Sequence, residues 1–265
     1  MSYAEINNEK FYYEIHGQNN DLIPLVMISG LACTCDVFGL CYSKFKSKRK
    51  IIVLDNRGSG RTEASFKNLT IEKMADDIND LLSYLNIENV NVLGHSMGGA
   101  IAQYFAFKYP QKTENLILVS TCSKTSERNK RYFSYFAKAM EEGISVDTWY
   151  NLFLPMIYTE SFCNSDDFEG LVSFCTMYPY QQAAEQFKEQ VEALSHFDSS
   201  SFLRKLTSKT LMISGELDFL IPMSESRKLN KAIPNSSLSL IKNAAHALTV
   251  EGVDELIAIV EKFIG

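Results

Sequence analysis

The chain has 265 residues, of which 46% are hydrophobic, as is ordinary for a globular protein, and it is long enough for one large domain or two small ones. Its 26 Lys and Arg against 32 Asp and Glu give a net charge of −6, so the charge balance predicts no binding to nucleic acid or to an anionic membrane. The first residues lack the basic and apolar segments of a secretion signal, and no apolar run is long enough to cross a bilayer. We therefore expect a cytoplasmic protein that acts on a small molecule or on another protein.

The opening segments YAEIN and FYYEIHG predict a β-hairpin that turns at Asn7-Asn8. Six short, almost continuous apolar runs follow, as expected for strands that are buried on both faces of a parallel sheet. These runs are PLVMIS (24–29), IIVLD (51–55), VNVLG (90–94), LILVS (116–120), TLMISG (210–215) and LSLIK (238–242). With the hairpin they predict a mostly parallel eight-stranded sheet flanked by helices.

Two helices between or after these runs have clear signals. Thr70 is a suitable N-cap for a helix whose apolar residues, from Ile71 to Leu85, recur at helical spacing. The C-terminal VDELIAIVEKFIG repeats this pattern, with Asp254 and Glu255 near its positive end.

Residues 124–200 interrupt the alternation of strands and helices and predict several consecutive helices. They include 15 of the 31 aromatic residues of the chain, Trp149 and Phe153 among them. Such a segment either covers an apolar cavity or fills a small core of its own. We expect a core domain formed by 1–123 and 201–265, and a helical cap, 124–200, inserted after the sixth strand.

Gly94-His95-Ser96-Met97-Gly98 matches the pattern G-x-S-x-G, between a predicted strand and a predicted helix. A sharp turn from strand to helix strains its central residue, and glycine on both sides avoids collisions. Ser96 would then present its hydroxyl at a helix N-terminus, where an oxyanion is stabilised. The motif predicts a nucleophilic serine.

A serine nucleophile needs a base, and the base needs an acid to orient it. Where a G-x-S-x-G turn joins a strand to a helix in a mostly parallel sheet, the acid and then the histidine are expected to follow the serine in the chain. Of the four histidines, His16 and His95 precede Ser96 and His196 precedes a strand, whereas His246 follows the last strand. We therefore predict His246 as the base.

The acid is expected at the end of a strand between Ser96 and His246. ISGELDFLIP places Asp218 there, three residues after Gly215, with Glu216 as the neighbouring alternative. TCS (121–123), which follows the preceding strand, contains no acid. Asp218 is the preferred assignment.

Taken together, these motifs resemble the α/β-hydrolase superfamily over nearly the whole chain. DNRGSGRT (55–62) is similar to a D-x-R-G-x-G-x-S loop of many members, with Thr62 where serine is usual, and Asp55 and Arg57 are expected to brace it. The resemblance implies chemistry without a cofactor. No metal site is expected either, because the Cys33-x-Cys35 pair lacks a second cysteine pair or a nearby histidine. The resemblance also implies that the backbone N–H groups of Leu31 and Met97 form the oxyanion hole.

The loop before Leu31 departs from the family pattern, because Ser29-Gly30 stands where His-Gly is usual. Nearby Gly30 and Phe38, together with Trp149 and Phe153, are candidates for substrate contacts. Cys33 and Cys35 either line the pocket or pack in the core. The six cysteines are expected to be free thiols, because no secretion signal is present.

The resemblance is to small carboxylesterases, including pimeloyl-carrier-protein methyl ester esterases of biotin synthesis. Enol-lactonases, carbon–carbon bond hydrolases and non-catalytic ligand receptors of the same fold are the alternatives. An acidic carrier protein would suit the basic cluster at the start of the cap, although a solvated helix face is the preferred explanation of the cluster. Its members are Lys124, Arg128, Lys130, Arg131 and Lys138.

Overall fold

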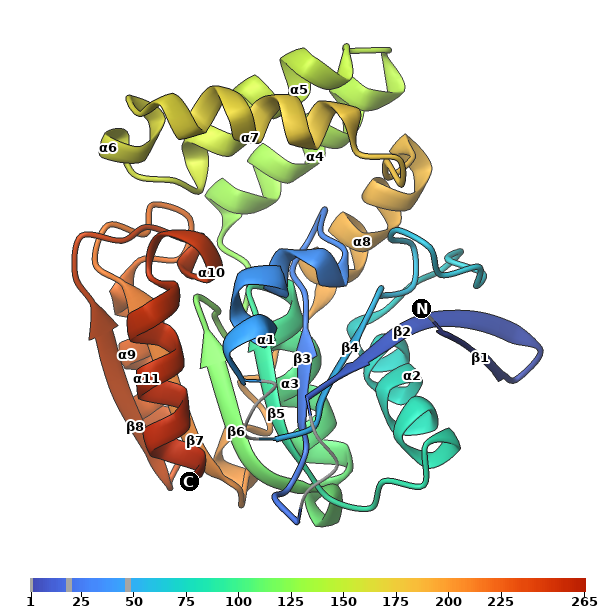
Figure 1. Cartoon of the computed structure of the whole chain (residues 1–265), viewed down its shortest axis with the longest axis vertical. Helices are drawn as coiled ribbons and strands as arrows, with labels where there is room; N and C mark the ends of the chain where they lie inside the picture. Colours follow the sequence, from blue (N-terminus) through green and yellow to red (C-terminus); the bar gives the residue numbers. More distant parts are fainter. Residues whose placement is uncertain (1, 18–20, 46–48) are drawn as a thin grey trace.

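The computed structural model describes residues 2–17, 21–45 and 49–265 (Figure 1). Its strands are β1 (Ser2–Ile6), β2 (Glu9–His16), β3 (Leu25–Ile28), β4 (Ile51–Leu54), β5 (Val90–His95), β6 (Thr113–Val119), β7 (Lys209–Gly215) and β8 (Ser236–Ile241). Its helices are α1 (Gly39–Phe45), α2 (Ile71–Tyr84), α3 (Met97–Lys108), α4 (Glu127–Glu141), α5 (Val146–Phe153), α6 (Glu160–Cys163), α7 (Asp166–Met177), α8 (Ala184–His196), α9 (Met223–Ala232), α10 (Leu248–Glu251) and α11 (Val253–Ile264).

All eight strands form one sheet in the order β1-β2-β4-β3-β5-β6-β7-β8. β1 and β2 pair antiparallel through a turn in which Asn7 and Asn8 have φ of 53° and 63°, as a tight hairpin requires. β2 is also antiparallel to β4, and the remaining neighbours are parallel. The predicted mostly parallel eight-stranded sheet is confirmed.

The central strands β3, β4 and β5 are buried along their whole length, which explains why their sequences are mostly apolar. Val26, Ile52 and Val92 belong to a core beneath helices α2, α3 and α9. Their neighbours along the strands, such as Met27 and Val53, belong to a second core beneath α1 and α11. Because successive residues of a strand point to opposite faces, one apolar run supplies both cores.

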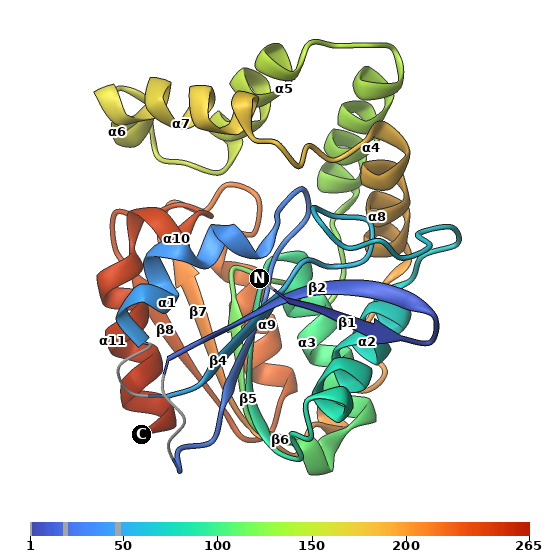
Figure 2. The same cartoon turned by 45° about the vertical axis from the view of Figure 1, so that its right-hand side comes forward.

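The predicted helix after Thr70 is present, and the Thr70 hydroxyl accepts a hydrogen bond from the backbone N–H of Lys73. Residues 124–200 form five helices, α4 to α8, of which the short α6 was not predicted. Both views show α5, α6 and α7 lying beyond the carboxyl ends of the parallel strands (Figures 1 and 2). Among the described residues, no helix has both the length and the apolar character needed to span a bilayer.

Candidate active site

Ser96 occupies the sharp turn between β5 and α3. Its φ of 56° and ψ of −118° lie in a region that residues with a side chain rarely adopt. A Cβ on Gly94 would lie 2.2 Å from the carbonyl oxygen of Gly98, and one on Gly98 would lie 2.1 Å from that of Ile28. The two glycines are therefore required by the close approach of β5, α3 and β3 around the serine.

Asp218 and His246 meet at the ends of β7 and β8. Asp218 Oδ2 accepts a hydrogen bond from His246 Nδ1 at 2.9 Å, and Oδ1 accepts one from the backbone N–H of Ile221 at 2.8 Å. Only 5% of the His246 side chain and none of the Asp218 side chain is exposed. With its proton held on Nδ1 by the carboxylate, His246 has a lone pair at Nε2 that can accept a proton.

Ser96 and His246 line the same pocket of about 20 Å³, which has room for about one water molecule. Met97, Leu220 and Ile221 also line it, so the first turn of α3 and the loop after β7 enclose the pair. The structure thus brings together the three residues that the sequence selected from segments far apart in the chain.

The alternative residues lie elsewhere. Glu216 accepts a hydrogen bond from the backbone N–H of Asn243 at 3.2 Å. His16 on β2 contacts Glu14, and His196 contacts the backbone of its own helix α8.

His95 has a contact that the sequence did not reveal. Its Nε2 lies 2.9 Å from the backbone oxygen of His246, 151 residues later in the chain. A carbonyl oxygen only accepts hydrogen bonds, so Nε2 carries the proton, and within the described residues Nδ1 has no partner. Burial, together with the nearby His246, lowers the pKa of His95 to about 4, so this imidazole is neutral at neutral pH.

The predicted oxyanion donors lie beside Ser96. Within the described residues, the backbone N–H groups of Leu31 and Met97 donate to no other protein group, and both residues are buried. Gly30 packs against the nucleophile, since a Cβ there would lie 3.1 Å from Ser96 Cβ. Free amides suit a developing negative charge, and that of Met97 also lies at the N-terminus of α3.

Ser29 supports this loop where an imidazole is usual in the family pattern. Its backbone oxygen accepts a hydrogen bond from Asn56 Nδ2 at 2.9 Å, and its hydroxyl donates to the oxygen of Cys33 at 3.4 Å. The loop is therefore attached to the neighbouring 55–62 turn through the backbone of Ser29.

The 55–62 turn is braced by buried ion pairs. Asp55 accepts hydrogen bonds from the backbone N–H and the Nε of Arg61, at 2.9 and 2.7 Å. Arg57 makes two-pronged contacts to both Asp77 and Glu9. Thr62 donates from its hydroxyl to the Asp55 backbone oxygen at 2.7 Å. This is the bracing expected for Asp55 and Arg57.

A larger cavity of about 350 Å³ lies between the sheet and helices α5 and α7. Trp149 and Phe153 line it, as do Ala32, His95 and Ala247, which are the chain neighbours of Leu31, Ser96 and His246. Asp36 is the one charged residue of its lining among the described residues.

Two expected substrate contacts do not reach this cavity. Phe38 is fully buried in the core beneath α1, because Cys35, Phe38 and Cys41 follow three-residue spacing and turn inward together. Cys33 lines the cavity, and burial raises the pKa of its thiol to about 12. Gly30 packs against Ser96 and is not part of the lining. All six cysteines are free thiols.

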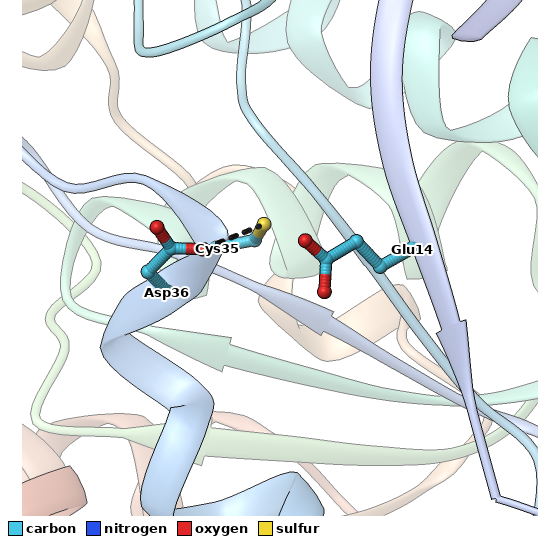
Figure 3. Close-up of side chains that lie close together, drawn as sticks. All are labelled: Glu14, Cys35 and Asp36. Atoms are coloured by element: carbon cyan, nitrogen blue, oxygen red, sulfur yellow. Dashed lines mark hydrogen bonds between the residues drawn. The ribbon is translucent and has the colours of Figure 1, made fainter. Parts of the chain in front are cut away.

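Glu14, Cys35 and Asp36 bring atoms that could ligate a metal within 4.8 Å of one another (Figure 3). A metal would need free carboxylate oxygens and a thiolate. Burial and the nearby Asp55 carboxylate raise the pKa of the Cys35 thiol, which disfavours the thiolate.

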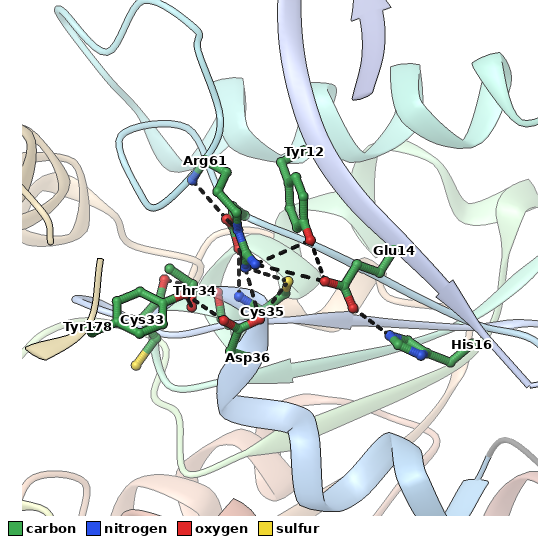
Figure 4. Close-up of polar contacts among 11 residues, drawn as sticks. Tyr12, Glu14, His16, Cys33, Thr34, Cys35, Asp36, Arg61 and Tyr178 are labelled. Atoms are coloured by element: carbon green, nitrogen blue, oxygen red, sulfur yellow. Dashed lines mark hydrogen bonds and ion pairs between the residues drawn. The ribbon is translucent and has the colours of Figure 1, made fainter. Parts of the chain in front are cut away.

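The carboxylate oxygens of this cluster are also occupied. All four oxygens of Glu14 and Asp36 lie between 2.5 and 2.9 Å from a donor: Tyr12 Oη, His16 Nε2, Arg61 Nη2 and Tyr178 Oη (Figure 4). The guanidinium already supplies the positive charge that a metal would bring. The residues form a network that joins α7's end to the core and do not fit a metal ion.

The family model described as the alpha/beta hydrolase fold matches residues 23–148 of this chain. The protein named carbamate hydrolase RutD from Agrobacterium fabrum is 25% identical over 252 residues, which cover 92% of this chain and 94% of that protein. The crystal structure of the enol-lactonase from Burkholderia xenovorans superposes with a TM-score of 0.90 at 20% identity, covering 99% of both chains. A thermophilic esterase from Thermogutta terrifontis superposes with a TM-score of 0.86 at 22% identity, covering 99% of this chain and 97% of that one.

The chain has the α/β-hydrolase fold, and the family model, the relative and the structural neighbours together support its assignment to that superfamily. The family model ends at residue 148, so it includes the Ser96 turn of this α/β-hydrolase but neither Asp218 nor His246. The candidate roles of Asp218 and His246 rest instead on their position at the ends of β7 and β8 and on the hydrogen bond between them.

Proposed function

We propose that this α/β-hydrolase is a serine esterase that cleaves a carboxylic ester through an acyl-enzyme on Ser96. The observation that carries the proposal is the buried Asp218–His246 hydrogen bond beside a serine held in a strained turn. A buried acid that orients an imidazole next to a serine is the arrangement that activates a hydroxyl for acyl transfer.

In the proposed reaction, Ser96 Oγ attacks the ester carbonyl while His246 Nε2 accepts the hydroxyl proton. The N–H groups of Leu31 and Met97 stabilise the oxyanion, and His246 then donates the proton to the leaving alcohol. Water then attacks the acyl carbonyl while His246 Nε2 accepts its proton. His246 returns this proton to Ser96 Oγ, and the acid is released. Asp218 keeps the imidazole in the required tautomer throughout.

The larger cavity suits a neutral, apolar acyl group, and the small pocket suits a small leaving group. The larger cavity offers aromatic and aliphatic side chains, and within the described residues it has no basic residue to pair with a substrate carboxylate. Burying an unpaired carboxylate there, close to Asp36, would be unfavourable. The pocket at Ser96 and His246 admits only a small group, such as the oxygen end of a short alcohol.

Other activities of the fold remain alternatives. A carbamate, an enol-lactone or a carbon–carbon bond next to a carbonyl would use the same serine, and relatives or structural neighbours carry the names carbamate hydrolase and enol-lactonase. A pimeloyl-carrier-protein ester is one candidate ester. A non-catalytic receptor would keep the pocket without turnover.

The basic cluster gives the carrier-protein partner little support. Arg128 donates from Nη2 to the backbone oxygen of Phe219 at 2.5 Å. Arg131 is exposed and has no side-chain hydrogen bond or ion pair within the described part of the chain. The other three members pair with neighbouring acids: Lys124 with Asp198, Lys130 with Glu127 and Lys138 with Glu142. Cations that are already paired attract an acidic protein less strongly.

The proposal is tested by labelling with a fluorophosphonate probe and by hydrolysis of p-nitrophenyl esters of increasing acyl length. We expect the wild type to label and to prefer uncharged acyl chains of medium length, and Ser96→Ala to lose both labelling and turnover. Trp149→Ala should move the preference towards longer chains, because it removes a wall of the cavity. A wild type that neither labels nor hydrolyses any of the series would refute the serine esterase and favour a receptor.

A further inference from the structure

The segment that carries His246 has no regular secondary structure. It runs from the end of β8 at Ile241 to the start of α10 at Leu248. Its own turn is closed by a hydrogen bond from the N–H of Leu248 to the oxygen of His246, at 2.9 Å. The position of the imidazole therefore depends on hydrogen bonds that neighbouring elements make to this loop.

Glu251, at the end of α10, makes one of these connections. Its Oε2 accepts a hydrogen bond from the backbone N–H of Ala245 at 3.2 Å. Its Oε1 accepts two from Thr159, from the backbone N–H at 3.1 Å and from the hydroxyl at 2.5 Å. Hydrogen bonds to an ionised carboxylate are stronger than those between neutral groups. One carboxylate thus joins the residue before His246 to the helical segment above the sheet.

Thr159 is itself well fixed. It is the N-cap of α6, and its hydroxyl accepts a hydrogen bond from the N–H of Phe162 at 3.1 Å while donating to Glu251. The residue is 7% exposed. Water therefore has little access to the Thr159 side of the contact.

A second, direct bond joins the same two segments. The backbone N–H of Ala247 donates to the oxygen of Ile157 at 3.0 Å. Ala245 and Ala247, on either side of His246, are thus both attached to residues 157–159 between α5 and α6. Figures 1 and 2 show α6 and α7 on the side of the molecule where α10 lies.

We propose that Glu251 is a positioning residue that makes the geometry of His246 depend on how α5 to α7 are seated over the site. The inference rests on the proposed role of His246 as the base. A displacement of about 1 Å in a reacting group costs roughly 100-fold in rate, so a carboxylate that fixes the loop affects proton transfer without touching substrate.

The experiment compares Glu251→Ala and Glu251→Gln with the wild type in kcat, KM and the rate constant for fluorophosphonate labelling. We expect kcat and the labelling rate to fall by roughly 10- to 100-fold in Glu251→Ala, with KM changed less than about threefold. Glu251→Gln should be intermediate, because its amide oxygen can still accept from Thr159 while its NH₂ cannot accept from Ala245. Glu255→Gln, an exposed residue on α11, is the matched control and should behave as the wild type.

Labelling separates the possible failures. If the wild type does not label, the proposed esterase function is itself refuted, and the role of Glu251 with it. The positioning role is refuted if the wild type labels and a folded Glu251→Ala labels at a rate within twofold of it. It is also refuted if the loss of kcat/KM in Glu251→Ala comes entirely from a higher KM.

If Glu251→Ala does not fold, Thr159→Val decides by the same criteria, with Thr159→Ser as the variant that keeps the hydroxyl. In a double variant, Glu251→Ala with Thr159→Val should lose no more kcat than Glu251→Ala alone, because both changes break the same connection. Additive losses would contradict the proposal.

Discussion

Asp218→Asn tests the proposed chemistry most directly, because the two oxygens of Asp218 have separate tasks. Oδ1 holds the loop by accepting from the N–H of Ile221 at 2.8 Å, and Oδ2 accepts from His246 Nδ1 at 2.9 Å. Asparagine can keep the first bond through its amide oxygen. Its NH₂ group then faces Nδ1, so the imidazole must turn its lone pair there and carry its proton on Nε2.

The size of the effect follows from burial. His246 and Asp218 have 5% and 0% of their side chains exposed, so water does not take over the lost contact. An imidazole protonated at Nε2 cannot accept the proton of Ser96. We expect kcat to fall by about 10³- to 10⁴-fold, equivalent to about 4–5.5 kcal/mol in activation free energy, while the fold is kept.

The assay is hydrolysis of a p-nitrophenyl ester at saturating substrate, with Ser96→Ala as the background. Glu216→Gln is the matched control, because Glu216 contacts Asn243 and should change kcat by less than about twofold. The reasoning is wrong if Asp218→Asn keeps more than a tenth of wild-type kcat, or if Glu216→Gln loses more activity than Asp218→Asn.

Three further predictions concern stability. Arg61→Met leaves Asp55 buried without its cation and should lower the free energy of unfolding in urea by about 3–5 kcal/mol. The control Lys108→Met breaks an exposed ion pair and should lower it by less than about 1 kcal/mol. Equal losses in the two variants would contradict this prediction. For His95, the pKa of about 4 in the folded chain lies below the unfolded value of 6.5, so the unfolded state binds more protons between these pH values and stability falls as pH drops from 6.5 to 4. The wild type should lose up to about 3 kcal/mol more than His95→Gln over that range in denaturant titrations, and parallel curves would count against the buried neutral imidazole. Gly98→Ala would place a Cβ 2.1 Å from a backbone oxygen, so a large drop in Tm is expected, and an unchanged Tm would show that the turn is looser than described.

The strands and the turn at Ser96 were predictable because their signals are local. An apolar run such as IIVLD identifies a strand that is buried on both faces wherever that strand lies in the sheet. The glycines around Ser96 are required because a side chain there would collide with the backbone nearby. Chain order then selected His246 and Asp218, since parallel strands bring their carboxyl ends to one edge of the sheet.

Contacts that depend on the rotation of a short helix or on the path of a loop were not predictable. Phe38 lies near the right place in the chain, yet the three-residue spacing of its turn directs it into the core, while Val37 and Leu40 reach the cavity. The bond from His95 to the backbone of His246 and the bridge through Glu251 have no local pattern either.

The sequence by itself thus determined the fold class, the strained turn at Ser96 and the chain order of its proposed partners, because each follows from periodicity, glycine placement or topology. Only the tertiary structure decided which side chains hold the His246 loop and which line the cavity. Those contacts join residues far apart in the chain, and a hydrogen bond of about 3 Å forms only where the folded backbone has placed both groups.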